Sequence, residues 1–211
     1  MVLTPILTPA GSFRQSAVTL AQAFQQDPMM TFLEPDPLKR ARVLPWFLGG
    51  VVRYCLAYGE VHTTPGGDAV ACWLTPGNTT VTPARIFRTG GLTTPLRLGL
   101  AAFRRLMDLQ NYMGEMHARH ASGPHFYLYL LGVDPLARGR GHGRALLTPM
   151  LARADTEGLP CYLETQNPQN VAVYASVGFR VTSEGDVPGH RLTVWTLRRE
   201  PQHGPTYKTL S

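Results

Sequence analysis

Residues 133–145 read Val-Asp-Pro-Leu-Ala-Arg-Gly-Arg-Gly-His-Gly-Arg-Ala, and glycines alternate with basic residues through the second half of the stretch. The apolar, aromatic run 125–133 leads into it and predicts a buried strand. Apolar residues at helical spacing follow it up to position 154 and predict a helix. The stretch is therefore predicted to be a glycine-rich turn from a strand to a helix.

A turn of this composition suits a phosphate or pyrophosphate ligand. Glycines have no Cβ, so the backbone can turn tightly and approach a ligand closely. The first N–H groups of a helix have no partner inside it and form the positive end of its dipole. Arginines between the glycines add fixed positive charge, which completes an anion site. The residues concerned are Arg138, Gly139, Arg140, Gly141, Gly143 and Arg144.

Two common phosphate motifs do not match. A Walker A loop ends in Gly-Lys-Ser or Gly-Lys-Thr, which this chain lacks. The dinucleotide fingerprint G-x-G-x-x-G requires glycine where this chain has Arg144 or Leu146. The pattern that remains is Arg138-x-x-Gly141-x-Gly143, shortly after Val133-x-Pro135.

This pattern resembles the acetyl-CoA loop of the GNAT superfamily of N-acetyltransferases. Residues 163–179, Leu-Glu-Thr-Gln-Asn-Pro-Gln-Asn-Val-Ala-Val-Tyr-Ala-Ser-Val-Gly-Phe, resemble the strand, helix and strand that follow that loop in the family. The resemblance implies an α/β (α+β) GNAT fold, with a mixed central sheet flanked by helices. It also implies acetyl-CoA as the co-substrate.

Part of the chain looks like one branch of that family. Residues 127–135 and 162–165, with a helical insertion ahead of them, are similar to the puromycin N-acetyltransferases. The resemblance covers about residues 15–199, but its motifs are specific only from about position 120. It does not imply that puromycin is the substrate.

Length and composition fit one enzyme domain. The 211 residues predict a single domain over 1–200 and a C-terminal tail over 201–211. No apolar run is long enough to span a bilayer, and the first residues do not read as a secretory signal. Three widely spaced cysteines, Cys55, Cys72 and Cys161, are expected to be core thiols in a reducing compartment, which indicates the cytoplasm.

The net charge of +6 does not by itself indicate nucleic acid. Basic residues are dispersed outside the loop, no nucleic-acid-binding motif is present, and a polyanionic coenzyme explains the loop charge equally well. We therefore expect no nucleic acid and no membrane among the partners. Homodimers are common in the family that the chain resembles, so a homodimer is one option.

Residues 77–122 depart from a minimal GNAT core. Helical segments are predicted near 83–88, near 96–109 and on towards 119, and we expect this insertion to cover the acceptor side. Its histidines, with one just beyond it, have irregular spacing and no cysteine nearby, so we expect no metal site. They are His117, His120 and His125.

The other elements follow from periodicity and punctuation. Residues 16–25 predict a helix that ends at Asp27-Pro28, with Met29, Met30 and Phe32 in a loop. A long helix, kinked at Pro45, is predicted over 37–58. A hairpin over 59–74, a strand over 159–164, a helix over 168–177 and two final strands complete the prediction.

The resemblance assigns coenzyme contacts to particular positions. It implies pyrophosphate binding by the loop 138–144, and pairing of pantetheine with the main chain of Val133. A backbone N–H near Leu131–Val133 is expected to stabilise the oxyanion, with Gly132 leaving room for the thioester. Asn170 is expected to contact the pantetheine or the thiol end of the coenzyme, or else to be a helix-cap or turn residue. The full expected set is Leu131, Gly132, Val133, Arg138, Gly139, Arg140, Gly141, His142, Gly143, Arg144 and Asn170.

Two side chains are candidates for proton transfer. Tyr174 occupies the position of the family's tyrosine and is expected to protonate the departing thiolate; packing under the coenzyme is the alternative. Glu164 ends its strand and is our candidate base for the acceptor ammonium; a structural hydrogen-bonding role is equally open. Tyr127 and Tyr129 share a strand face and, with Phe32, are candidates to line the acceptor pocket; packing is the alternative.

The sequence therefore predicts an N-acetyltransferase. The leading hypothesis is transfer to a primary amine of a small molecule, such as an antibiotic or other xenobiotic. No Ser-His-Asp or Cys-His arrangement demands a covalent intermediate, which favours direct attack in a ternary complex. The alternatives are a protein or peptide N-acetyltransferase and a non-catalytic acetyl-CoA sensor.

Overall fold

The computed structural model describes residues 4–8 and 13–202. Seven strands form one sheet in the order β1-β2-β3-β4-β5-β7-β6. The strands are β1 Ile6–Leu7, β2 Gly59–Thr63, β3 Ala69–Leu74, β4 Phe126–Val133, β5 Cys161–Thr165, β6 Arg180–Asp186 and β7 Thr193–Arg199. Every neighbouring pair is antiparallel except β4 and β5, so the sheet is mixed, as predicted.

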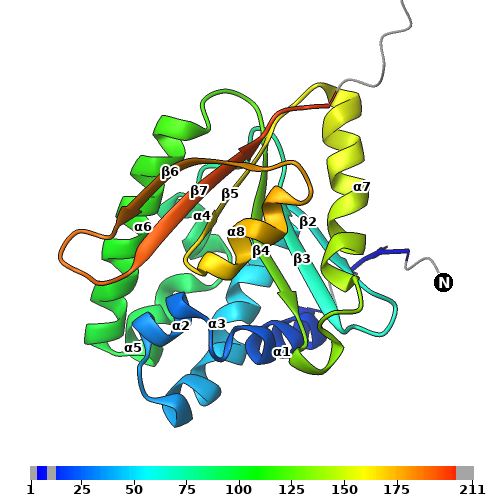
Figure 1. Ribbon diagram of the computed structural model, residues 1–211. Helices are drawn as coiled ribbons and strands as arrows, with labels where there is room; N and C mark the ends of the chain where they lie inside the picture. The colour runs from blue at the N-terminus through cyan, green and yellow to red at the C-terminus, as the bar shows by residue number, and fades with distance from the viewer. Residues whose placement is uncertain (1–3, 9–12, 203–211) are drawn as a thin grey trace, which may run out of the picture.

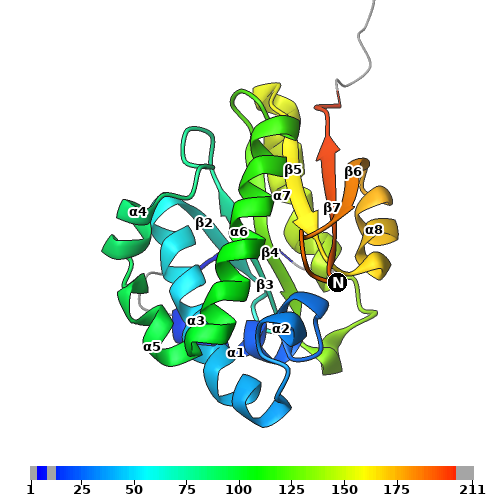
Figure 2. The same cartoon turned by 90° about the vertical axis from the view of Figure 1, so that its left-hand side faces the viewer.

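Helices cover both faces of the sheet (Figures 1 and 2). On one face lie α1 Phe13–Phe24, α2 Pro28–Leu33, α3 Pro37–Tyr58, α4 Pro83–Arg88, α5 Thr94–Leu98 and α6 Leu100–His120. On the other lie α7 His142–Glu157 and α8 Pro168–Ala175. Each face has its own apolar core, one against α1 and α3 and the other against α7. The predicted α/β class is confirmed.

The sheet opens between its only parallel strands. β4 and β5 pair at Phe126–Cys161 and Tyr127–Tyr162 alone, and then separate. In the same strand, Leu128 pairs with Trp73 and Leu130 with Cys72, so Tyr129 is the extra residue of a β-bulge. The main-chain groups of β4 that face β5 therefore have no partner strand beyond Tyr127.

The segment 28–33 is a helix, so the predicted loop there is wrong. Asp27 is its N-cap, because the carboxylate accepts a hydrogen bond from the Met29 N–H at 2.9 Å. Pro28 occupies the first helical position, where its missing N–H costs nothing. The Asp-Pro pair therefore starts a second helix rather than only ending the first.

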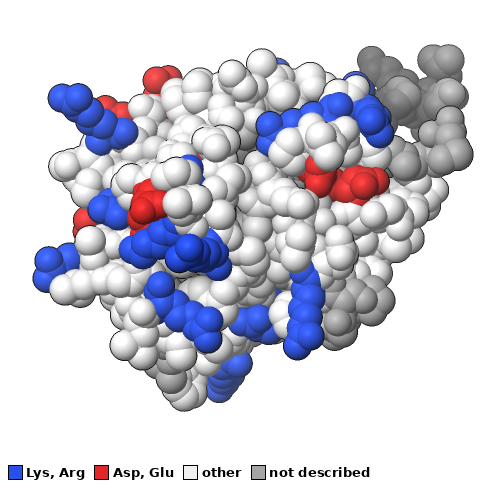
Figure 3. Space-filling model, turned by 90° about the horizontal axis from the view of Figure 1, so that it is seen from below, with Lys and Arg blue, Asp and Glu red and all other residues white. Residues whose placement is uncertain are grey.

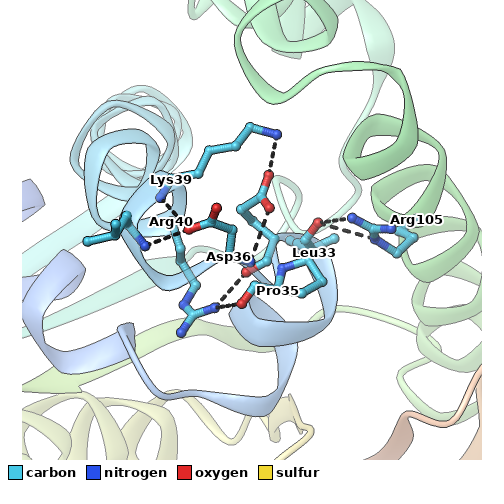
Figure 4. A network of polar contacts seen from close by, with 8 residues as sticks. Leu33, Pro35, Asp36, Lys39, Arg40 and Arg105 are labelled. Carbon is cyan, nitrogen blue, oxygen red and sulfur yellow. Dashed lines mark hydrogen bonds and ion pairs between the residues drawn. The ribbon is translucent and has the colours of Figure 1, made fainter.

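Two arginines hold the end of α2 in place (Figure 4). Arg40 of α3 is buried and donates to the carbonyl oxygens of Glu34 and Pro35, at 2.6 and 3.0 Å. Arg105 of α6 donates to the carbonyl oxygen of Leu33 at 2.6 Å. Helices α2, α3 and α6 are thus tied together beside the opening in the sheet.

Most other predicted elements are present with shifted ends. The 37–58 helix runs as one element through Pro45, and α7 runs through Pro149. The helices expected in the insertion are α4, α5 and α6. β1 occupies two residues near the N-terminus. The predicted tail lies outside the described residues from 203 onwards.

Candidate functional site

A small cavity of about 80 Å³ lies where β4 and β5 separate. Its walls come from both strands, from α2 and α8, and from α6 of the insertion. The lining side chains that matter below are Asp27, Gln110, Tyr129, Glu164, Asn170 and Tyr174. Two of the sequence candidates for proton transfer, Glu164 and Tyr174, are therefore brought to one cavity.

Glu164 is held by a tyrosine of the neighbouring strand. The Tyr127 hydroxyl donates to Glu164 Oε2, while Oε1 is buried and has no hydrogen-bond partner among the described residues. Burial raises the pKa of Glu164 to about 7, against the hydrogen bond from Tyr127, which lowers it. A carboxyl group with such a pKa can take up and release a proton near neutral pH.

Aromatic and imidazole rings pack behind this carboxylate. His117 stacks on Tyr162 with ring centroids 5.0 Å apart and lies 4.8 Å from the Tyr127 ring. Its Nε2 is 2.8 Å from Nε2 of His125, whose Nδ1 is 2.8 Å from the Gly123 carbonyl oxygen. Because a carbonyl only accepts, His125 donates there and His117 donates to His125.

These rings carry no charge at neutral pH. Burial lowers the pKa of His117 to about 4, and burial also lowers the pKa of His125. Burial and the nearby Glu164 raise the pKa of the buried Tyr162 phenol. The Glu164 carboxylate therefore has neutral neighbours on this side.

Tyr174 of α8 lines the same cavity. It is buried, and burial followed by the charge of Asp27 raises the pKa of its phenol. Burial also raises the pKa of Asp27 to about 6. Sequence reasoning missed Asp27 as a cavity residue because it was interpreted only as the end of a helix; its position as the N-cap of α2 directs it inwards.

Asn170 lines the same cavity and is not a helix cap. Its Nδ2 donates to Thr165 Oγ1 at 3.3 Å, and the N-cap of α8 is Asn167, which accepts from the Gln169 N–H. The helix-cap alternative for Asn170 is therefore wrong. Its contact with a coenzyme stays a prediction.

The glycine-rich loop has the geometry expected of an anion site. Gly139 and Gly141 have φ of 77° and 80°, values that favour glycine. No side chain caps the N-terminus of α7, whereas Asp27, Asp36 and Asn167 cap α2, α3 and α8. The first amides of α7 are thus left for a ligand.

The loop arginines differ in whether their side chains bond to the rest of the protein. Arg138 donates to the Ala23 carbonyl at 2.9 Å and, at 3.4 Å, to that of Val133, so it also joins the loop to α1. Arg140 and Arg144 are exposed. Lys and Arg outnumber Asp and Glu on the lower face of the molecule, which Figure 3 shows.

His142 is buried in the first turn of α7, and its Nδ1 has no partner among the described residues.

The structure gives Gly132 a packing role that the sequence did not predict. A Cβ there would come within 2.7 Å of Leu20 Cδ2 and 3.0 Å of Ala23 Cβ, both on α1. The glycine therefore lets α1 pack closely on β4, and its role in leaving room for a thioester stays a prediction. The main chain of residues 131–133 remains a candidate for coenzyme contacts.

The three residues that the sequence suggested for the acceptor pocket differ in whether they line a cavity. Tyr129 lines the small cavity and also a larger one beside it. Tyr127 lies on the same face of β4 as Tyr129, and the centroids of their rings are 5.3 Å apart. Tyr127 lines neither cavity; its hydroxyl donates a hydrogen bond to Glu164 instead. Phe32 also lies outside both, with its ring 5.0 Å from that of His190, which favours the packing alternative.

The larger cavity has a volume of about 380 Å³. It lies between α3 and the helices α4, α5 and α6, and shares Phe47, Val51, Leu106, Gln110 and Tyr129 with the small cavity. The insertion therefore borders a cavity that shares part of its wall with the cavity of Glu164.

Residues 4–8 and 13–202 contain no group of three or more His, Cys, Asp or Glu residues placed to hold a metal ion. None of their helices is both long and apolar enough to cross a membrane. Cys55, Cys72 and Cys161 are buried free thiols, as expected.

Comparisons with known proteins agree with this geometry. Residues 98–179 match the family described as the acetyltransferase (GNAT) family. An uncharacterized N-acetyltransferase of Schizosaccharomyces pombe is 24% identical over 176 residues, which cover 81% of this chain and 71% of that protein. The mycothiol acetyltransferase of Streptomyces avermitilis is 38% identical over 76 residues, only 35% of this chain and 23% of its own length.

The fold has solved counterparts. The crystal structure of arylalkylamine N-acetyltransferase 2 from Aedes aegypti has a TM-score of 0.60 and 16% identity, and the match covers 95% of this chain and 99% of that one. At this identity the likeness concerns the fold. The chain therefore has the fold of these acetyltransferases, and residues 98–179 are similar to the acetyltransferase (GNAT) family.

Proposed function

We propose that this N-acetyltransferase, which has the GNAT fold, transfers the acetyl group of acetyl-CoA to a primary amine of a small molecule by direct attack in a ternary complex. The observation that carries the proposal is the cavity between β4 and β5, where Glu164 and Tyr174 meet. A base and an acid in one cavity are what amide formation from a thioester requires.

The coenzyme would lie between the loop and the open strands. The uncapped N-terminus of α7, with Arg140 and Arg144 beside it, would hold the pyrophosphate. The unpaired edge of β4 beyond Tyr127 supplies main-chain groups for the pantetheine and a backbone N–H for the oxyanion. Asn170 lies beside this edge in the small cavity.

Glu164 would accept the proton that the acceptor ammonium loses. Its pKa of about 7 lets the ionised form be populated at physiological pH while keeping the carboxylate basic. The amine nitrogen then attacks the acetyl carbon, and Tyr127 holds Oε2 so that the carboxylate keeps its orientation. Direct contact and transfer through one water are both compatible with this role.

Tyr174 would protonate the thiolate as the carbon–sulfur bond breaks. A phenol titrates near ~10 and a thiol near ~8.5, so the transfer is uphill in water. Burial keeps the phenol protonated but makes it a weaker acid, so the step depends on its close placement to the sulfur. Products are the N-acetylamine and free coenzyme A.

Supporting observations favour a small acceptor in the cytoplasm. The insertion helices border the larger cavity, which favours a small molecule over a protein substrate. The free cysteines are compatible with a reducing compartment. The resemblance to the puromycin branch stays a prediction, and puromycin belongs in the panel of amines to be tested. Whether the protein is a homodimer also stays a prediction.

The test is steady-state thiol release from acetyl-CoA with primary amines, for wild type, Glu164→Gln and Glu157→Gln. Glu157 is an α7 residue paired with Arg153, away from the cavity, and serves as the matched control. Glu164→Gln should lower kcat/KM for the amine by about 10²–10⁴-fold, with acetyl-CoA affinity unchanged. Equal activity of the two variants would remove Glu164 from the mechanism.

A further inference from the structure

The side chains that line the larger cavity indicate which kind of acceptor fits there. Aromatic side chains form much of its wall, and aliphatic side chains fill the gaps between them. The aromatic residues are Trp46, Phe47, Tyr54, Phe87, Phe103 and Tyr129. Such a lining, at about 380 Å³, is typical of a site for a small apolar ligand.

The larger cavity shares wall residues with the cavity that contains the proposed base. Tyr129 and Gln110 belong to both cavities, and Glu164 lies in the smaller one. The Tyr54 ring stacks on Tyr129, with centroids 6.3 Å apart, so the wall continues from the junction towards α3. A ligand with its amine at Tyr129 would extend its body away from Glu164.

The charged groups around the cavity are cationic. Among the described residues that line it, Arg53 is the charged one, and none is Asp or Glu. The Arg53 guanidinium lies over the Phe13 ring at 5.2 Å and makes a 3.5 Å contact with the Thr89 carbonyl. Arg97 covers the lining residue Trp46 at 5.2 Å. A second ammonium would be buried here without a carboxylate and near an arginine, which is unfavourable.

The outer wall is a short helix with apolar side chains at the surface. No side chain of α4 is buried, yet Ile86 and Phe87 line the cavity while 38% and 59% exposed. Exposed apolar side chains at the rim of a cavity are expected where an apolar ligand docks. The helix therefore marks the open side of the site.

From these observations we infer that the acceptor is an apolar aromatic monoamine that lies in this cavity, with its amine at Tyr129 and its ring between α3 and α4–α5. The inference rests on the proposed function and narrows it. The part of the acceptor remote from the amine reaches Arg53, so an anionic substituent is accepted there and a cationic one is rejected.

The first experiment compares three acceptors that differ only at the remote end. Benzylamine, 4-(aminomethyl)benzoate and 4-(aminomethyl)benzylamine carry there a hydrogen, a carboxylate and a second ammonium. We expect kcat/KM for benzylamine and the benzoate to exceed that for the diamine by about 100-fold, after correction for its two amino groups. Arg53→Gln should reduce the preference for the benzoate over the diamine at least tenfold.

The second experiment fills the cavity. Gly50 of α3 lines it, and a Cβ there would meet only Arg53 Nη2, at 3.7 Å. Gly50→Leu therefore places a side chain in the space without a backbone clash, and leucine is a better helix former than glycine. Gly114→Leu on α6, where a Cβ would meet nothing within 4 Å, is the matched control. Gly50→Leu should lower kcat/KM for benzylamine at least 30-fold, and Gly114→Leu less than twofold.

The outcomes separate the inference from the function on which it rests. If amines are acetylated but the diamine reacts as well as benzylamine, or Gly50→Leu reacts like Gly114→Leu, the inference is wrong and the proposed function stands. If acetyl-CoA binds and no amine is acetylated, the proposed function is wrong. Calorimetric titration with benzylamine in the presence of coenzyme A then decides the binding site: binding lost only in Gly50→Leu supports the cavity, and equal binding or none overturns it.

Discussion

At the scale of single residues, the proposed chemistry depends on how the surroundings of Glu164 change the pKa of its carboxyl group. Glu164 was chosen because it ends a strand, and the sequence left open whether it is a base or a structural partner. The structure adds the Tyr127 hydrogen bond, the unpartnered Oε1 and a pKa of about 7. These features come from residues distant in sequence, so no local pattern contains them.

Glu164 should also affect the pH dependence of stability. Its pKa rises from the ordinary value of 4.5 to about 7 in the folded protein, so between these pH values the native state holds a proton that the unfolded chain has lost. Its contribution to stability is therefore present at low pH and lost as the pH rises through 7. Urea unfolding at pH 5.5 and 8 should show wild type losing stability relative to Glu164→Gln at the higher pH. The same difference at both pH values would contradict the raised pKa.

Tyr174 gives a second prediction at this scale. Tyr174→Phe keeps the buried ring and removes only the hydroxyl, so the fold should be unaffected. Loss of the proton donor should lower kcat by about 10–100-fold, while calorimetry should find acetyl-CoA affinity within twofold of wild type. An unchanged kcat would leave Tyr174 with the packing role that the sequence also allowed.

At the scale of elements, periodicity predicted the strands and long helices well and failed where the chain reverses quickly. The six residues 28–33 are too few to show a helical period, and their start signal, Asp27-Pro28, also reads as a stop. The bulge at Tyr129 could not be predicted either, because the alternation of inward and outward side chains along a strand does not show where one extra residue is inserted. Both features shape the cavity.

The loop before α7 can be tested through its backbone. Gly141→Ala puts a Cβ on a residue with φ of 80°, which should cost about 1–2 kcal/mol and displace the first amides of α7. We expect acetyl-CoA affinity to fall at least fivefold by calorimetry. Gly114→Ala, in a helix, should instead raise stability by about 0.5–1 kcal/mol and leave affinity unchanged. Normal affinity in Gly141→Ala would show that the coenzyme does not depend on this turn.

The anchor of α2 gives a prediction about stability. Arg40→Met removes the donor to the Glu34 and Pro35 carbonyls in a buried position and should destabilise the protein by about 1–3 kcal/mol in urea unfolding. Arg119→Met breaks an ion pair with Glu115 in which both side chains are about two-thirds exposed, and should cost no more than about 1 kcal/mol. Similar costs for both variants would show that the buried contacts of Arg40 are not the anchor.

At the scale of the whole molecule, the mixed sheet and its flanking helices were predicted through the resemblance of two sequence motifs to the GNAT superfamily, and the structure has them. The insertion was predicted as a departure, and its helices were found where expected. Its cavity could not be predicted, since the walls join α3 to segments about 30–60 residues later. Packing across such separations leaves no periodic signal.

The central claim is direct transfer of the acetyl group from acetyl-CoA to an amine bound beside Glu164. It is tested most directly by rapid-quench mixing of the enzyme with acetyl-labelled acetyl-CoA, with and without benzylamine. We predict that N-acetylbenzylamine and free thiol form in one phase when the amine is present, and that no label becomes attached to the protein in its absence. A burst of acetylated protein without amine, or thiol release without N-acetylbenzylamine, would contradict the claim.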